Sequence, residues 1–282
     1  MIKDKKIYIL VLFFSTYIFL GLFIYQDFGI GIEEHFQRKN GFYWLDYLLS
    51  FSDYHVLKET VNLKYKEILL SNPNLPNIVF FNYYGIIFDV PVAFIESIFN
   101  LENSKTYFEI RHILIFLIFL LSSFFFYKIL LKRFNFPIAF LGLCIYSLTP
   151  RIFGDSFHNN KDILFLSLLT IAISYLFNFF DKSNNKSLII FCLFSALATS
   201  TRIMGIYLPI LLILFIYLEF LTNKKNLINF FGLFFKIIFF YILFLYLHYP
   251  YIWQLNIFEI SDWFSKFFFS MNLNILFNGH YY

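Results

Sequence analysis

The chain has 282 residues, of which 60% are hydrophobic, 24% aromatic and only 14% charged. A soluble domain carries about 25% charged residues, so this chain has more apolar surface than one soluble core can bury. The net charge of +4 is not arranged as a basic stripe with interleaved aromatics, so nothing indicates a nucleic-acid partner. We therefore expect an all-α polytopic membrane protein.

Seven apolar runs are long enough, or nearly long enough, to cross a bilayer as helices. The first follows Lys3, Lys5 and Lys6, and no small-residue cleavage site comes after it, which indicates an uncleaved signal anchor. The expected spans cover 7–25, 112–131, 135–150, 162–180, 187–203, 205–222 and 230–249. We expect the whole chain, 1–282, to form a single membrane domain.

Basic residues indicate which way the spans run. If the N-terminus is cytoplasmic, the short outer connections contain only Arg151, Lys161 and Arg202. The cytoplasmic segments then contain Lys3, Lys5, Lys6, Lys128, Lys132, Arg133, Lys182, Lys186, Lys224 and Lys225. Because cytoplasmic loops carry the excess of Lys and Arg, we expect a multi-pass protein of the cell membrane with a cytoplasmic N-terminus.

Two longer segments are expected on the external side. Segment 26–111 contains an aromatic stretch at 41–47, a helical stretch of mixed charge at 53–70 and an apolar stretch at 79–99. We interpret the last as interfacial helices, because each of its two carboxylates would cost about 2.5–3.5 kcal/mol inside a span; an eighth span is the alternative. Segment 250–282 ends without a closing span, so a truncated chain is a second interpretation of this end.

An acidic pair, Glu33 and Glu34, follows the first span at the outer surface. A carboxylate in this place can accept the proton of an acceptor hydroxyl as that hydroxyl attacks, and such general-base help is typically worth about 10²–10⁴-fold in rate. The alternative is a solvated acidic pair in a loop. Asp27 competes for the same role, but it lies closer to the end of the span.

A polar island separates the third and fourth spans, from Thr149 to Asp162. Arg151 can fork onto phosphate oxygens, Lys161 adds a point charge, and the following helix begins here with its positive dipole end outward. His158 lies in the same island. The alternative is local: an asparagine caps the helix, and the arginine extends to the membrane surface without binding a ligand.

Arg202 interrupts a later apolar region among small polar neighbours, which makes it a candidate for function, with a surface-anchoring role as the alternative. Arg111 and His112 open the second span, where we favour anchoring. Side chains able to ligate a metal are Glu33, Glu34, His35, Asp155 and His158. The chain has no zinc or EF-hand motif, so we expect no cofactor, and a divalent metal is the less favoured alternative.

Taken in chain order, these motifs resemble a known family. The acidic pair after the first span, the string from Pro150 to Asp162, and the later Thr201–Ile203 are similar to motifs of the membrane glycosyltransferases of the GT-C fold. Within that fold, the chain resembles the dolichyl-phosphate-mannose–protein mannosyltransferase and aminoarabinose transferase-like group. The string from Pro150 is the most specific part of the resemblance.

The resemblance implies transfer of a sugar from a polyprenyl-phosphate donor to an acceptor lipid, glycan or protein on the outer face, among membrane lipids. It implies a catalytic base at Glu33, a position that is usually Asp in the family, with Glu34 beside it. It also implies that cations hold the lipid phosphate, here Arg151, Lys161, Arg202 and His158. Family members usually continue through more spans, so a truncated or non-catalytic member is one alternative.

A multi-pass transporter is the alternative from another class. Transporters place their ionisable residues near the membrane midplane and often contain paired repeats. In this chain the notable polar residues gather at one face, and a long external segment follows the first span. That distribution favours chemistry on a lipid-linked substrate at the membrane surface.

Overall fold

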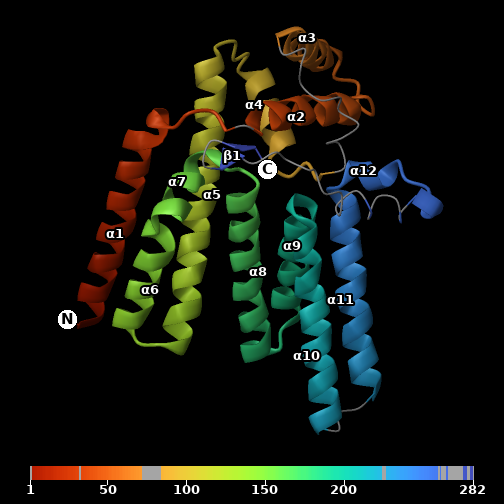
Figure 1. The fold of residues 1–282 in the computed structure, drawn as a ribbon. Helices are drawn as coiled ribbons and strands as arrows, with labels where there is room; N and C mark the ends of the chain where they lie inside the picture. Colours follow the sequence, from red (N-terminus) through yellow and green to blue (C-terminus); the bar gives the residue numbers. More distant parts are fainter. Residues whose placement is uncertain are drawn as a thin grey trace.

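The computed structural model describes residues 2–31, 33–71, 84–223, 227–259, 261, 265, 276–277 and 280–281. These residues are almost entirely helical (Figure 1). The longer helices are α1 (Ile2–Ile24), α2 (Glu34–Leu49), α3 (His55–Ser71), α4 (Asp89–Ile98), α5 (Ser104–Arg133), α6 (Phe136–Leu148), α7 (Pro150–His158), α8 (Asp162–Lys182), α9 (Asn185–Thr201), α10 (Tyr207–Asn223) and α11 (Leu227–Leu247). The short elements are η1 (Tyr25–Asp27), η3 (Ile203–Ile206), α12 (Pro250–Trp253), η4 (Ile257–Glu259) and the antiparallel pair β1 (Leu276–Phe277) and β2 (His280–Tyr281).

The helices form two groups. Figure 1 shows α1, α5, α6, α8, α9, α10 and α11 running side by side as a bundle, with α2, α3, α4 and α12 gathered at one end. The N-terminus lies at the opposite end of the bundle. Large apolar side chains such as Phe23 and Phe235 stand exposed on the bundle, at 73% and 61%. A soluble protein rarely exposes so much apolar surface, whereas a bilayer covers it.

Within the described ranges, five helices are long and apolar enough to cross a membrane, and the bent pair α6–α7 makes a sixth if it counts as one span. The seventh predicted span corresponds to α9, which is apolar but has only 17 residues. The all-α polytopic class is therefore confirmed, with a helix at each predicted span. Helix α5 begins at Ser104, about two turns before the predicted start of its span.

The bend between α6 and α7 follows from one dipeptide. Thr149 has a ψ of 122° and precedes Pro150, and the proline ring disfavours the helical region for the residue before it. The chain resumes a helix immediately, because proline fits the first helical position. The two helices meet at 55°, which leaves α7 and its polar residues at the end of the bundle where α2 and α4 lie (Figure 1).

Asparagines start three helices of the bundle. Asn103, Asn135 and Asn184 each accept a hydrogen bond from a backbone N–H in the first turn of α5, α6 and α9 respectively. Such N-caps satisfy donors that a helix start leaves unpaired. At the far end of α8, Ser183 takes a left-handed conformation with φ of 49°, which stops that helix. The tight turns keep consecutive helices adjacent.

Four apolar clusters hold these elements, and the smallest of them joins α1, α5 and α6. One lies among α8, α9, α10 and α11, and a second joins α1, α5, α7 and α8, where Phe116 is 1% exposed. The third holds α2, α3, α4 and α12 together around Phe42 and Trp44, both fully buried. The helices at the end of the bundle therefore have a core of their own, which gives the start of α2 a rigid support.

Gly41 lies where α2 packs on α4, and a Cβ there would sit 2.4 Å from the Asp89 carbonyl oxygen. Because that neighbour is backbone, we expect Gly41→Ala to destabilise the protein by about 1–3 kcal/mol through overpacking. Gly154, inside α7, has no atom within 4 Å of its Cβ position. Gly154→Ala should be neutral or stabilising by up to about 1 kcal/mol. Thermal unfolding in detergent measures both, and equal effects would contradict the close packing at Gly41.

Candidate functional site

A pocket of about 590 Å³ lies where four parts of the chain meet at one end of the bundle. These are the loop after η1 with the start of α2, the end of α7, the start of α8, and the residue that follows α9. The charged or ionisable side chains in its wall are Glu33, Glu34, His158, Asp162 and Arg202. Four of the six residues predicted as a site thus share one pocket.

The acidic pair forms the start of α2. Glu33 is the N-cap and Glu34 the first helical residue. Glu34 Oε2 accepts a hydrogen bond of 2.6 Å from the Gly31 N–H, which closes the preceding loop onto the helix. A carboxylate is stabilised at a helix N-terminus, so the sequence favours this local fold. The two acids then differ sharply: Glu34 is 2% exposed, whereas the Glu33 side chain is 56% exposed.

A histidine of α5 contacts Glu34. His112 Nε2 lies 3.3 Å from Glu34 Oε2, and both side chains are buried. Sequence reasoning favoured an anchoring role for His112 at the start of the second span, and its partner, 78 residues away in the chain, gave no local signal. The structure instead places His112 in contact with Glu34 of the acidic pair. Glu34 is therefore fixed by buried contacts, whereas the exposed carboxylate of Glu33 can contact a ligand in the pocket.

Lys161 is in direct contact with Glu33. Its Nζ is 3.1 Å from Glu33 Oε2 and 4.0 Å from the centre of the Tyr84 ring, and its side chain is 16% exposed. Gln37 Nε2 donates to the same oxygen of Glu33 at 3.4 Å. An acid that follows the first span and a cation of the polar island are therefore in direct contact.

Arg202 follows α9 in an extended conformation and reaches the pocket wall. Its Nη2 is 2.5 Å from Asp162 Oδ1, at the first residue of α8. Asn159 caps this helix by accepting the Asp162 N–H at 3.0 Å, as its local alternative role required. His158 also lines the pocket, and its ring stacks on Phe28 with centroids 6.0 Å apart.

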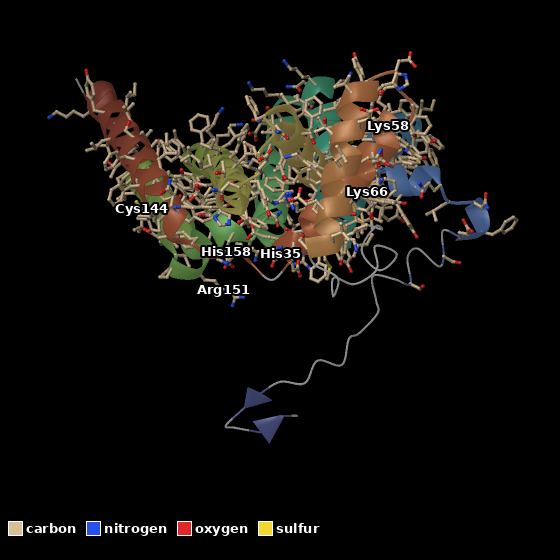
Figure 2. All side chains as sticks on the ribbon, turned by 90° about the horizontal axis from the view of Figure 1, so that it is seen from above. His35, Lys58, Lys66, Cys144, Arg151 and His158 are labelled. Carbon is tan, nitrogen blue, oxygen red and sulfur yellow. The ribbon has the colours of Figure 1, made fainter. Side chains whose placement is uncertain are left out.

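Arg151 lies apart from these groups. Its side chain is 91% exposed, and it is not among the described residues that line the pocket. Its ion-pair contact is a loose one of 3.8 Å with Asp155, one helical turn away. Figure 2 shows Arg151 projecting outward from the edge of the protein beyond His158. Arg151 was predicted to bind phosphate. In this structure it does not contact the pocket that is lined by four of the other predicted residues.

A second layer of buried ion pairs supports the pocket. Arg111 Nη2 is 2.6 Å from Asp89 Oδ1. Arg38 forms an ion pair with Glu96, with a shortest N–O distance of 2.5 Å. Burial raises the pKa of Asp89, and the Arg111 guanidinium opposes that rise. The sequence signalled the two acids only as charges in an apolar stretch. A buried carboxylate requires a cation beside it. This rule was the one indication in the sequence that Asp89 and Glu96 would have basic partners.

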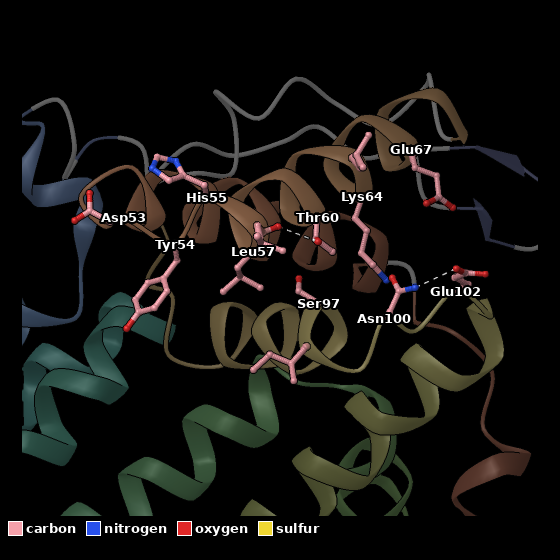
Figure 3. Close-up of a pocket in the computed structure, with 13 residues that line it drawn as sticks. Asp53, Tyr54, His55, Leu57, Thr60, Lys64, Glu67, Ser97, Asn100 and Glu102 are labelled. Atoms are coloured by element: carbon pink, nitrogen blue, oxygen red, sulfur yellow. Dashed lines mark hydrogen bonds between the residues drawn. The ribbon is translucent and has the colours of Figure 1, made fainter.

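A larger hollow of about 1130 Å³ lies elsewhere, between α3 and the end of α4 (Figure 3). It contains none of the predicted site residues. Among the described residues in its wall, Lys64 is the one Lys or Arg; it is 6% exposed and donates to the Leu101 carbonyl at 2.7 Å. Because this hollow offers no available strong cation for a phosphate, the smaller pocket is the better candidate site.

The metal-ligand candidates do not gather at one point. Within the described part of the chain, no three His, Cys, Asp or Glu side chains lie close enough together to hold a metal ion. His35 packs against Phe108, with ring centroids 5.0 Å apart, and burial lowers its pKa. His158 and Asp155 are 3.7 Å apart, at the other side of the pocket.

Comparison with known proteins gives one match. A sequence model of the family described as dolichyl-phosphate-mannose-protein mannosyltransferase matches residues 90–247, a little over half of the chain. The matched range contains the polar island and Arg202 but begins after the acidic pair. No curated protein and no solved structure matches significantly. The chain therefore belongs to the dolichyl-phosphate-mannose-protein mannosyltransferase family and is a multi-pass membrane glycosyltransferase of the GT-C type.

Proposed function

We propose that this protein transfers a sugar from a polyprenyl-phosphate donor to an acceptor hydroxyl on the outer face of the cell membrane. The observation that carries the proposal is the contact between the exposed carboxylate of Glu33 and the ammonium of Lys161, beside Arg202, at one end of an apolar helix bundle. A base and two cations at a membrane surface suit a substrate whose lipid lies in the bilayer. Family membership also favours this enzyme over the transporter alternative.

In the proposed reaction, Glu33 removes the proton of the acceptor hydroxyl while the hydroxyl oxygen attacks the anomeric carbon. The bond from that carbon to the phosphate oxygen breaks, and the lipid phosphate leaves with the bonding electrons. This direct displacement inverts the configuration at the anomeric carbon. Lys161, Arg202 and the start of α8 stabilise the charge that grows on the phosphate.

Charge at the other end of the bundle supports this orientation. Lys132 and Arg133 end α5 and meet Asp181 near the end of α8, at 3.4 Å and 3.2 Å. This end also contains the N-terminus (Figure 1). Since cytoplasmic surfaces collect Lys and Arg, we place this end in the cytoplasm and the pocket outside.

The direct test uses the purified full chain in lipid nanodiscs with a panel of polyprenyl-phosphate sugars. Mass spectrometry follows loss of the donor and formation of the lipid phosphate, with heat-treated protein as the control. We expect at least one donor to be consumed by the intact protein. If no donor in a panel of hexose and pentose derivatives is consumed, the proposal is wrong.

Two arginines allow a matched comparison within this test. Arg202→Ala should lower the rate of transfer about tenfold or more, because a charge-assisted hydrogen bond is worth about 1.5–3 kcal/mol. Arg151→Ala should stay within about twofold of the wild type, because the exposed Arg151 side chain does not reach the pocket. Initial rates at a fixed donor concentration decide between them. The reverse order would restore Arg151 as the phosphate ligand.

A further inference from the structure

One side chain separates Lys161 from the pocket. The Lys161 side chain is 16% exposed and is not among the described residues of the pocket wall, whereas Glu33 is 56% exposed and lines it. The two meet at 3.1 Å, Nζ to Oε2. In this arrangement the carboxylate covers the face of the ammonium that a ligand in the pocket would otherwise reach.

Within the described ranges, the other sides of Lys161 leave little room for a large anion. The Tyr84 ring lies 4.0 Å from Nζ. Two small cavities border Lys161, with volumes of about 30 Å³ and 20 Å³, and both are also lined by Gln37 and Asp89. A cavity of that size holds about one water molecule. Among the residues that the structure describes, the approach to Lys161 that is wide enough for a phosphate group leads from the pocket, past Glu33.

We propose that Lys161 exchanges one anion for another: it pairs with Glu33 in the empty enzyme and with the phosphate of the donor when the donor binds. The inference rests on the proposed function in one respect, namely that the ligand of this pocket carries a phosphate. In the empty enzyme the Lys161 ammonium lies against Glu33 Oε2, which is then not free to meet an acceptor hydroxyl. Donor binding draws the ammonium to the phosphate and frees that carboxylate oxygen for the acceptor.

The exchange is energetically accessible. Ion pairs between partly exposed groups are weak, because water solvates each partner separately. A phosphate offers the ammonium several acceptor oxygens in place of one carboxylate. The consequence is an order of events: the donor phosphate takes Lys161 from Glu33 before Glu33 Oε2 meets the acceptor hydroxyl. Arg202 and its partner Asp162 are not needed for this step.

A zero-length cross-link tests the contact without any knowledge of the sugar. A water-soluble carbodiimide activates the Glu33 carboxylate; the Lys161 amine then forms an amide, and the carbodiimide leaves as a urea. We expect this cross-link in the purified full chain, detected by peptide mass spectrometry, and its suppression by undecaprenyl phosphate but not by undecaprenol. The pair Lys105–Glu109, 3.6 Å apart on α5, is the internal control and should cross-link equally in all samples. A Glu33–Lys161 cross-link that persists at saturating undecaprenyl phosphate overturns the exchange.

Binding of undecaprenyl phosphate gives a second and less intuitive test. Glu33→Gln should bind this lipid about three- to fivefold more tightly than the wild type, because the competing anion is gone. Lys161→Gln should bind it about tenfold more weakly or worse, and Glu109→Gln should not change binding. Native mass spectrometry measures all four proteins. Equal or weaker binding by Glu33→Gln contradicts the proposal.

These outcomes are separable from those of the transfer assay. Donor consumption together with a lipid-insensitive cross-link would leave the transferase function standing and remove the exchange. A lipid-sensitive cross-link without any donor consumption would leave the phosphate site standing and remove the proposed transfer.

Discussion

Glu33→Gln is expected to lower the rate of sugar transfer by about 10²–10⁴-fold, the usual contribution of a general base. The amide keeps the size of the side chain and cannot take up the proton of the acceptor hydroxyl. Because Glu33 is more than half exposed, its replacement should leave the fold intact. The measurement is the initial rate of donor consumption, together with the thermal unfolding temperature of the same preparation.

Two other glutamates serve as comparisons for this experiment. Glu59→Gln, on the exposed face of α3, should transfer at the wild-type rate. Glu34→Gln tests the other member of the acidic pair: its carboxylate is buried against Gly31 and His112, so the change should lower the unfolding temperature along with activity. Full activity in Glu33→Gln, with a stable Glu34→Gln that is inactive, would transfer the role of base to Glu34.

The spans were predictable because each is a continuous apolar run. The physical rule behind them is strong: in a bilayer every backbone polar group must be satisfied inside the segment, which leaves helices as the solution for such runs. The exact limits were less predictable. Helix α5 continues outward to Ser104, past the end of the apolar run, because its first turns pack on the external helices instead of facing lipid. Hydropathy does not report that kind of burial.

The acidic pair was found from its place after the first span, yet its local structure was not. A charged dipeptide before an aromatic stretch gives no apolar periodicity, so the sequence did not indicate that α2 begins at Glu34. The start is fixed by the hydrogen bond from Gly31 and by the buried contact with His112. Those contacts also decide which of the two acids is exposed, and a neighbouring pair in a sequence does not carry that information.

Arg151 and Lys161 illustrate the same limit among the cations. Both belong to one polar island, and either residue type suits a phosphate. In the structure they lie at opposite ends of the α7 segment, where Lys161 turns towards Glu33 and Arg151 faces outward. The bend at Pro150 sets this difference, because it determines which side of α7 faces the bundle. Sequence spacing limits the candidates, and packing selects between them.

Arg38→Met is expected to destabilise the protein by about 3–5 kcal/mol, the cost of leaving one member of a buried ion pair without its partner. Arg38 reaches across from α2 to Glu96 on α4, its guanidinium lies 3.8 Å from the centre of the Tyr107 ring on α5, and both charged side chains are under 10% exposed. The pair therefore fixes α2 to α4, and the contact of Arg38 with Tyr107 ties α2, and with it the acidic pair, to α5 of the bundle. A fall in the thermal unfolding temperature in detergent measures the effect, and Lys105→Met, which removes the 70% exposed partner of Glu109, should leave that temperature unchanged.

The double variant Arg38→Met with Glu96→Leu separates charge from packing. If the cost comes from an unpaired buried carboxylate, removing both charges should recover most of the lost stability, because an apolar pair of similar volume often replaces a buried ion pair without loss. If the cost comes instead from lost contact with Tyr107, the double variant should unfold as easily as Arg38→Met alone. Activity adds a further criterion: a double variant that is stable yet slow in transfer would mean that the pair positions the start of α2 as well as holding it.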